Sequence, residues 1–228
     1  MTSAIIVAAG RGTRMGPNVD KLFLEVAGHP VVAHTWKRFD VTACIDDIVL
    51  VVREGMEGAF SDLSATLGLT KPFRIVPGGQ ERQDSVWSGL DALSNSTEIV
   101  AIQDGARPCT SPELIAATVQ AAREFGAAVA AQRVTDTIKE SADGLTISKH
   151  LDRHRLWSVQ TPQAFRVEVI RRALGAVMEK DLLVTDDTAA CEWIGQPVKL
   201  VDSVTPNPKI TVASDLPLLE ILLQPPPA

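Results

Sequence analysis

The amino-acid sequence predicts a doubly wound α/β fold, in which helices cover both faces of a mostly parallel sheet. Short apolar runs alternate along the chain with amphipathic helical patterns. The run "DDIVLVV" at 46–52 is continuous in Ile, Val and Leu after its two aspartates, as in parallel strands that are covered on both sides. The chain has 228 residues, 45% of them hydrophobic, which is enough for one sizeable core.

The elements of the first two thirds of the chain follow one another in βα order. The predicted strands are the short apolar runs at 3–9, 46–52, 73–79, 97–104 and 127–134. The predicted helices lie between them at 30–39, 57–68, 81–93 and 111–126. The last helix is the best marked, because Ser111 can cap its N-terminus, Pro112 takes the first helical position and Gly126 can end it.

The alternation breaks between Arg133 and Arg155. Two short strand-like pieces flank an Ala-Asp-Gly turn there, which predicts a β-hairpin. A hairpin that projects from an α/β body has exposed edges and usually needs a partner. A helix at 167–180, a helix opened by Thr185-Asp186-Asp187, a strand at 198–203 and a helix from Ser214 follow. We expect one domain over 1–228, with an arm inserted at about 133–155 and a disordered tail at 224–228.

Charge and composition narrow the class of protein. The net charge of −6 argues against a nucleic-acid partner, because binding a polyanion needs a basic face. The three cysteines are too few and too scattered for a disulfide framework, and an odd count fits a reducing compartment. The sequence shows neither a signal-peptide pattern nor an apolar run long enough to span a membrane. We therefore expect a cytoplasmic protein without a membrane partner.

A glycine-rich loop follows the first predicted strand, in the stretch "IIVAAGRGTRMGPNVDKLF" at 5–23. It has the first two glycines of the dinucleotide fingerprint, but Met15 stands where the third belongs, and no acidic residue ends a second strand about 20 residues later. The P-loop pattern is also absent from the sequence. Small residues can still let the backbone reach phosphate oxygens, which Arg14 and Lys21 can contact. The alternative is a tight turn with solvated basic residues.

A second polar group lies where the strand at 97–104 ends. Asp104 closes that strand and Arg107 follows it, and ligands of open α/β sheets bind outside the carboxyl ends of the strands. A carboxylate beside a triphosphate most often holds Mg²⁺, which keeps waters and phosphates as its other ligands. The alternative is a turn residue that pairs with Arg107.

Two further segments hold candidate site residues. Gly78 and Gly79 end the strand at 73–79 and suit a backbone pressed against a flat base, or an ordinary turn into the next helix. Lys209 follows two prolines in "TPNPKITV", where it is either fixed in one place or simply a solvated loop residue.

Taken in order, these motifs resemble those of the 2-C-methyl-D-erythritol 4-phosphate cytidylyltransferases. The match covers nearly the whole chain, and its motifs are "AAGRGTRMG" with Lys21, "GGQERQDSV", "DGARP", "VTDTIK", "LDR", "LWSVQTPQAF", "VTDD" and "PNPKIT". The first motif is shared by many sugar-nucleotide transferases, whereas "TPQAF" together with the late "KIT" is far more specific. The resemblance implies a Rossmann-like sheet with a β-arm that reaches across a homodimer.

The resemblance also implies an enzyme that joins CTP to 2-C-methyl-D-erythritol 4-phosphate and releases pyrophosphate, in non-mevalonate isoprenoid synthesis. The implied nucleotide-binding residues are Ala8, Ala9, Gly10, Gly12, Gly79, Gln80, Ser85 and Asp104, with Asp104 near Mg²⁺. The implied catalytic residues, which stabilise the α-phosphate, are Arg14, Lys21 and Lys209. The implied polyol-phosphate residues are Arg107, Thr161 and Thr185, together with Thr137 and Arg153 from the neighbouring subunit.

The residue types fit this chemistry. The attacking group is already a phosphate dianion, so the reaction needs fixed cations and a metal rather than a strong base. The sequence departs from the family at Asp20-Lys21-Leu22, where Pro-Lys-Gln is usual, and an aspartate there could offset part of the lysine charge. It also has Gln80 where some relatives have aspartate.

Three other functions remain to be compared with this one. A ribitol-phosphate cytidylyltransferase would share the nucleotide motifs and differ in the polyol pocket. An NAD-dependent oxidoreductase is disfavoured by Met15 and by the missing ribose-binding acid. A catalytically inactive nucleotide-binding regulator is disfavoured because Arg14, Lys21 and Lys209 are all present.

Overall fold

The computed structural model describes residues 1–10 and 20–224. Gly12 and Arg14, which the sequence places in the phosphate loop, lie outside the described residues. The tail predicted to be disordered also lies outside them, apart from Gln224.

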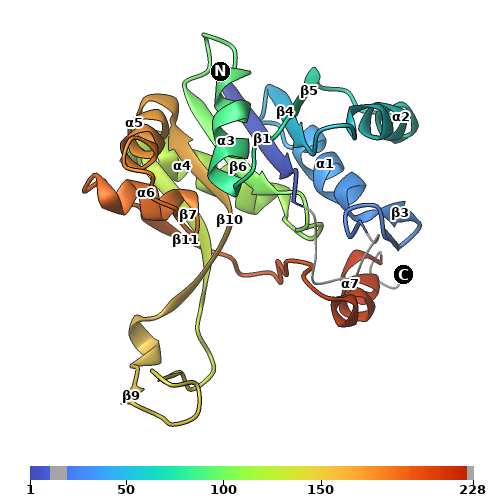
Figure 1. Ribbon diagram of the computed structural model, residues 1–228. Coiled ribbons are helices and arrows are strands. Elements are labelled where there is room, and N and C mark those ends of the chain that lie inside the picture. Colours follow the sequence, from blue (N-terminus) through green and yellow to red (C-terminus); the bar gives the residue numbers. More distant parts are fainter. Residues whose placement is uncertain (11–19, 225–228) are drawn as a thin grey trace.

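A seven-stranded sheet forms the centre of the molecule, with the strand order β11-β7-β10-β6-β1-β4-β5 (Figure 1). Its strands are β1 (Thr2–Ala8), β4 (Asp47–Val52), β5 (Phe73–Pro77), β6 (Ile99–Asp104), β7 (Ala127–Arg133), β10 (Trp157–Arg166) and β11 (Lys199–Asp202). The pairs β1–β4, β1–β6, β4–β5 and β7–β11 are parallel, whereas β10 runs antiparallel to both β6 and β7. The predicted mostly parallel sheet is therefore confirmed.

Helices pack on both faces of this sheet, as the sequence predicts. One face carries α1 (Val31–Val41), α2 (Glu57–Leu67), α4 (Pro112–Phe125) and α7 (Leu216–Leu223), and the other carries α3 (Arg82–Asp91), α5 (Val167–Met178) and α6 (Asp187–Trp193). Strand β1 shows how one segment serves two cores, because successive side chains point to opposite faces. Ala4 and Ile6 pack in the α1 and α4 core, and Ile5 packs in the α3 and α5 core.

The local signals of α4 are confirmed in atomic detail. The hydroxyl oxygen of Ser111 accepts a hydrogen bond from the backbone N–H of Leu114 at 3.2 Å. Gly126 ends the helix in the left-handed conformation, with φ of 86°, which glycine adopts without steric cost.

The β-arm is the outer part of a long hairpin whose legs are β7 and β10. These strands are antiparallel neighbours in the sheet, and the chain between them leaves the body and returns (Figure 1). The arm contains β8 (Lys139–Glu140), β9 (Lys149–His150) and the 3₁₀ turn η2 (Arg153–Arg155). Leu145 is 90% exposed and Ile147 is 69% exposed near its tip. The predicted projecting hairpin is confirmed, and its role in dimerisation stays a prediction.

The sequence patterns did not reveal four elements. They assign no element to 156–165, where the structure has β10, and its pairing with β7 shifts register between Val159 and Gln163. They also do not predict the small hairpin of β2 (Glu25–Val26) and β3 (His29–Pro30), or the 3₁₀ turn η3 (Ala213–Asp215) before α7. Among the helices that the structure describes, none is long and apolar enough to cross a membrane.

Candidate active site

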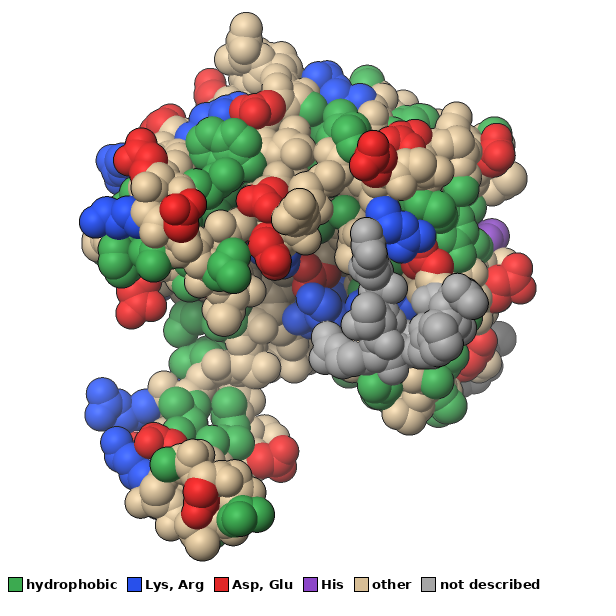
Figure 2. Space-filling view, viewed as in Figure 1, with side chains coloured by type: hydrophobic (Ala, Val, Ile, Leu, Met, Phe, Trp, Pro, Cys, Tyr) green, Lys and Arg blue, Asp and Glu red, His purple; other side chains and the backbone are tan. Residues whose placement is uncertain are grey.

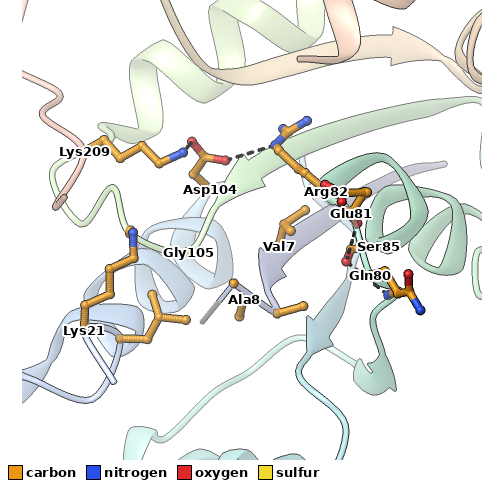
Figure 3. Close-up of a pocket in the computed structure, with 15 residues that line it drawn as sticks. Val7, Ala8, Lys21, Gln80, Glu81, Arg82, Ser85, Asp104, Gly105 and Lys209 are labelled. Atoms are coloured by element: carbon orange, nitrogen blue, oxygen red, sulfur yellow. Dashed lines mark hydrogen bonds and ion pairs between the residues drawn. The ribbon is translucent and has the colours of Figure 1, made fainter. Parts of the chain in front are cut away.

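A cleft opens at the carboxyl ends of β1, β5 and β6, where a parallel sheet places its ligands. Its cavity volume is about 170 Å³, and its mouth is open to solvent. Its lining is drawn from the strand ends and the loops that follow them: Val7, Ala8, Ala9, Gly10, Lys21, Leu22, Gly79, Gln80, Glu81, Arg82, Ser85, Asp104, Gly105, Ala106 and Lys209. Figure 3 shows how these residues surround the space.

Small residues are required where the strand ends approach one another. A Cβ on Gly78 would lie 2.6 Å from the Cβ of Ala9 and 2.7 Å from the hydroxyl oxygen of Ser85. A Cβ on Gly105 would lie 3.1 Å from the carbonyl oxygen of Val7. The floor of the cleft is therefore backbone and methyl groups in close contact, a surface that a ligand can approach closely.

Asp104 is a centre of charge in this cleft. Its carboxylate is 2.7 Å from the ammonium of Lys209, 3.4 Å from Nε of Arg82 and 3.6 Å from Nε of Arg107. Burial alone would raise the pKa of Asp104, but Lys209, Arg82 and Arg107 overcome that effect and lower the pKa to about 2. Asp104 is therefore an anion at neutral pH, as a metal ligand has to be.

Arg82 bridges two carboxylates that come from different parts of the chain. Its Nη2 atom is 2.9 Å from Oδ2 of Asp187, which is fully buried, while its Nε atom faces Asp104. Burial lowers the pKa of Arg82, but Asp187 and Asp104 overcome burial and raise it above the ordinary arginine value. Burial raises the pKa of Asp187, because it disfavours the charged carboxylate, and the neighbouring guanidinium of Arg82 opposes that rise.

A short strap at 205–209 presents Lys209 to Asp104. The buried side chain of Asn207 holds the strap: its Nδ2 atom donates to Oε1 of Gln160 at 3.1 Å and to the carbonyl of Thr161 at 2.8 Å, and its Oδ1 atom accepts from Thr110 at 2.8 Å. Both N–H donors and the oxygen of this amide are thus used. Lys209 is fixed by this network, so it is not the solvated loop residue that the sequence left possible.

Arg107 and Thr161 lie beside the cleft, next to this strap. Nη1 of Arg107 donates to the carbonyl of Asn207 at 2.7 Å, and burial lowers the pKa of Arg107, although Asp104 opposes that effect. The hydroxyl oxygen of Thr161 accepts a hydrogen bond from the backbone N–H of Asp104 at 3.1 Å, so Thr161 helps to place that carboxylate. Arg107 also lines a neighbouring hollow, together with Gln160, Asn207 and Lys209.

Lys21 lines the cleft on the same side as Lys209, across the space from Gln80 and Ser85 (Figure 3). Its ammonium donates to the carbonyl of Ile210 at 3.0 Å, and the buried Leu22 anchors the segment next to it. The carboxylate of Asp20 forms an ion pair with Arg53 at 3.2 Å, and its other oxygen accepts from the N–H of Leu22 at 3.1 Å. The departure from the family pattern therefore serves local structure: Asp20 pairs with another cation and Leu22 joins the core.

The loop after β5 also lines the cleft. The N–H of Gly79 donates to the hydroxyl of Ser85 at 3.2 Å, and a Cβ on Gly79 would lie 2.3 Å from the Cβ of Asp84. Glu81 and Asp84 form a capping box that begins α3. Close packing of the loop on its own helix thus explains glycine at position 79, and the contact of this loop with a base stays a prediction.

The structure gathers some of the predicted site residues and separates others. The cleft lining includes Ala8, Ala9, Gly10, Lys21, Gly79, Gln80, Ser85, Asp104 and Lys209, and Arg107 and Thr161 lie next to it. Thr137 and Arg153 are exposed on the arm and do not line the cleft of their own chain. Thr185 is exposed just before α6.

Sequence reasoning missed three residues of this site. Arg82 stands out in the sequence only as a cation near Ser85, Asp187 is a helix-start acid, and Asn207 is a loop residue between two prolines. Their partners lie far away in the chain: 105 residues separate Arg82 from Asp187, and 46 separate Thr161 from Asn207. Only the folded sheet brings them together.

The residues present fit a metal that arrives with a triphosphate. Among the described residues, no group of three or more His, Cys, Asp and Glu side chains could hold a metal ion alone. Asp104 nevertheless offers one ionised carboxylate in the cleft. Mg²⁺ is commonly bound by one or two carboxylates together with substrate phosphates and water.

Comparisons with known proteins support one family. The model of the 2-C-methyl-D-erythritol 4-phosphate cytidylyltransferase family matches residues 2–225. A protein of that name from Pelotomaculum thermopropionicum is 43% identical over 223 residues, which are 97% of this chain and 94% of the relative. Another from Geobacillus kaustophilus is 43% identical over 220 residues, which are 96% of each chain.

Solved structures agree with the sequence relatives. The crystal structure of 4-diphosphocytidyl-2C-methyl-D-erythritol synthase from Anaerococcus prevotii superposes with a TM-score of 0.87 at 33% identity, over 98% of this chain and 96% of that one. That of 2-C-methyl-D-erythritol 4-phosphate cytidylyltransferase from Thermus thermophilus gives a TM-score of 0.79 at 31% identity, over 97% and 98%. The chain therefore belongs to the 2-C-methyl-D-erythritol 4-phosphate cytidylyltransferase family and is a nucleotidyltransferase.

Proposed function

We propose that the cleft beside Asp104 is where this chain joins CTP to 2-C-methyl-D-erythritol 4-phosphate, giving 4-diphosphocytidyl-2-C-methyl-D-erythritol and pyrophosphate in isoprenoid biosynthesis. The observation that carries the proposal is the set of cations fixed around one carboxylate at the carboxyl ends of the strands. Two polyanions have to meet in this reaction, and fixed cations in a partly enclosed site stabilise them most effectively.

The nucleotide occupies the part of the cleft formed by the strand ends. Ala8, Ala9 and Gly10 offer the close backbone surface that suits the triphosphate. Gly12 and Arg14, which the resemblance also assigns to the nucleotide, lie outside the described residues. Gly79, Gln80 and Ser85 border the same space from β5 and α3, where they would contact the cytosine and the ribose. The hydrogen bond between Gly79 and Ser85 keeps that edge in one conformation.

The reaction is a substitution at the α-phosphorus of CTP. An oxygen of the polyol phosphate attacks, the new P–O bond forms, and the bond to pyrophosphate breaks with its electrons leaving on the pyrophosphate oxygen. Lys21 and Lys209, with Arg14, would neutralise the charge that accumulates on the equatorial oxygens. No side chain needs to remove a proton, because the nucleophile is already an anion.

Magnesium is the cofactor that this arrangement would use, with Asp104 as its protein ligand. When bound, it would supply positive charge that offsets the charge of the phosphates. Lys209 is 2.7 Å from Asp104 in the structure, so it would shift from the carboxylate to a phosphate as substrates enter. The side chain is 35% exposed and can make that movement.

The polyol phosphate would lie on the Arg107 side of the cleft, near Thr161, with Thr185 from the segment before α6. The arm carries Thr137 and Arg153 away from the body of its own subunit (Figures 1 and 2). We infer that in a homodimer each arm reaches the cleft of the other subunit, so that body and arm act as one catalytic unit. The three free thiols of Cys44, Cys109 and Cys191 support a cytoplasmic location.

The test is the release of pyrophosphate from CTP in the presence of single polyol phosphates. With Mg²⁺, 2-C-methyl-D-erythritol 4-phosphate should give rapid release, and ribitol 5-phosphate should give release at least about tenfold slower at the same concentration, since a mismatch of polar groups costs more than that. ATP, GTP and UTP serve as nucleotide controls. Faster release with ribitol 5-phosphate would contradict the proposed substrate, and no release with any polyol would contradict the enzyme itself.

A further inference from the structure

The pair of Arg82 and Asp187 stands out because it is buried and incompletely satisfied. Asp187 has no exposed surface, and its Oδ1 atom has no hydrogen-bond partner among the described residues. A buried carboxylate with one free oxygen costs stability, and replacing such pairs with apolar groups is often neutral or favourable. The role of Asp187 is therefore explained by its partner, Arg82.

Helix capping does not explain Asp187. The neighbouring Asp186 performs that task, because its carboxylate accepts from the N–H of Ala189 at 2.9 Å and from the hydroxyl of Thr188. Gln163 binds both aspartates, donating to Asp186 at 2.9 Å and accepting from the N–H of Asp187 at 3.2 Å. The carboxylate of Asp187 is therefore available to pair with the guanidinium of Arg82.

The segment before α6 is fixed onto the first turn of α3, so the pair is held on both sides. The side-chain amide of Gln83 donates to the carbonyl of Leu182 and accepts from the N–H of Val184, each at 3.0 Å. Arg82, one residue earlier in α3, lines the nucleotide cleft and reaches Asp104. The Nη1 atom of Arg82 has no hydrogen-bond partner among the described residues.

We propose that Asp187 is a positioning residue, which fixes Arg82 at the edge of the cleft so that its guanidinium can serve the nucleotide. Asp187 is the closer partner of Arg82, at 2.9 Å against 3.4 Å for Asp104. The guanidinium stays in place when Asp104 changes partners as CTP enters. The planar fork of arginine can hold both carboxylates at once and still offer a donor, which lysine cannot do. This inference rests on the proposed function, because it needs the cleft to bind CTP.

The test measures CTP affinity by isothermal titration calorimetry, with thermal melting of each variant as a check of the fold. Asp187→Asn keeps the shape of the side chain and removes its charge, and it should weaken CTP binding by about tenfold, the size of a coupling between contacting residues. Asp186→Asn is the matched control: asparagine also caps helices, so CTP affinity should stay within about twofold of the wild type. In an Arg82→Gln background, Asp187→Asn should have no further effect on affinity.

The outcomes separate the possible failures. Wild-type affinity in a folded Asp187→Asn protein would overturn the inference, as would a full additional loss in the Arg82→Gln background. If Asp187→Asn does not fold, Arg82→Lys takes its place: it keeps the charge and loses the fork, and an unchanged CTP affinity in this variant would equally overturn the inference. Failure of the wild-type protein to bind CTP would instead contradict the proposed function.

Discussion

Single side chains at the cleft are held by contacts from distant parts of the chain. Lys209 reaches Asp104 because Asn207, two residues earlier, is bonded to Gln160, Thr161 and Thr110. The ammonium is thus placed before any substrate arrives. A charge held in the cleft in this way needs only to move from the carboxylate to a phosphate, so little free energy is spent on arranging it during the reaction.

Lys209→Ala should lower kcat by about 10²–10³, the usual cost of losing one fixed charge that stabilises a transition state. CTP affinity should fall less, because the charge matters most when the new bond forms. Steady-state rates of pyrophosphate release and CTP calorimetry measure the two effects. Lys199→Ala is the matched control, as that side chain packs over the ring of Phe125 on the surface. A wild-type kcat for Lys209→Ala would remove this lysine from the mechanism.

Gly79→Ala should lower both stability and CTP affinity. The added Cβ would lie 2.3 Å from the Cβ of Asp84, so the loop or the start of α3 has to move. Overpacking of this kind costs about 1–3 kcal/mol. Gly58→Ala is the control, because nothing lies within 4 Å of its Cβ and alanine is at least as favourable as glycine in a helix. Chemical denaturation compares them, and an unchanged stability in Gly79→Ala would show that the loop adapts freely.

At the scale of elements, the sequence predicted the parts that local patterns encode. The strand–helix alternation and the caps of α4 were predicted from apolar spacing and from Ser111, Pro112 and Gly126. Strand β10 was not, because it carries no strict alternation and its pairing with β6 and β7 is set by the whole sheet. The arm was predicted as a hairpin around an Ala-Asp-Gly turn, where the βα alternation breaks. Its position follows from the antiparallel pairing of β7 with β10.

Removing the arm should leave the body folded and weaken the binding of only one of the two substrates, the polyol phosphate. Replacing residues 136–154 with a short Asn-Gly turn would join the two legs where the backbone N–H of Val134 already donates to Leu156. We expect a melting temperature within a few degrees of the wild type, because exposed residues dominate the arm. CTP affinity should be retained, while the KM for the polyol phosphate rises at least about tenfold.

A point variant provides the control for the shortened arm. The double substitution Thr137→Ala and Arg153→Ala keeps the arm and removes the two side chains assigned to the polyol phosphate. It should keep the oligomeric state, measured by analytical ultracentrifugation, and lose activity. Full activity in the protein without the arm would show that the arm has no part in the site.

At the scale of the whole molecule, one chain does not bring all of the implied site residues together. The body places the nucleotide residues, Asp104 and both lysines in one cleft, whereas Thr137 and Arg153 lie on an arm that points away from it (Figure 2). The sequence could name these residues from the resemblance, but it could not place them relative to the cleft. In the proposed two-fold dimer with exchanged arms, each cleft would meet the arm of its neighbour.

The most direct test mixes two variants, Lys209→Ala and Arg153→Ala, each nearly inactive alone. If Arg153 serves the neighbour's cleft, a mixed dimer has one site with both lesions and one site with neither. Random equal mixing makes about half of the dimers mixed, so about a quarter of all sites should be intact. Co-expression with two different affinity tags confirms the mixed dimers, and pyrophosphate release measures the sites. We predict that about a quarter of the wild-type activity returns, and activity at the level of the single variants, with mixed dimers confirmed, would contradict the shared active site.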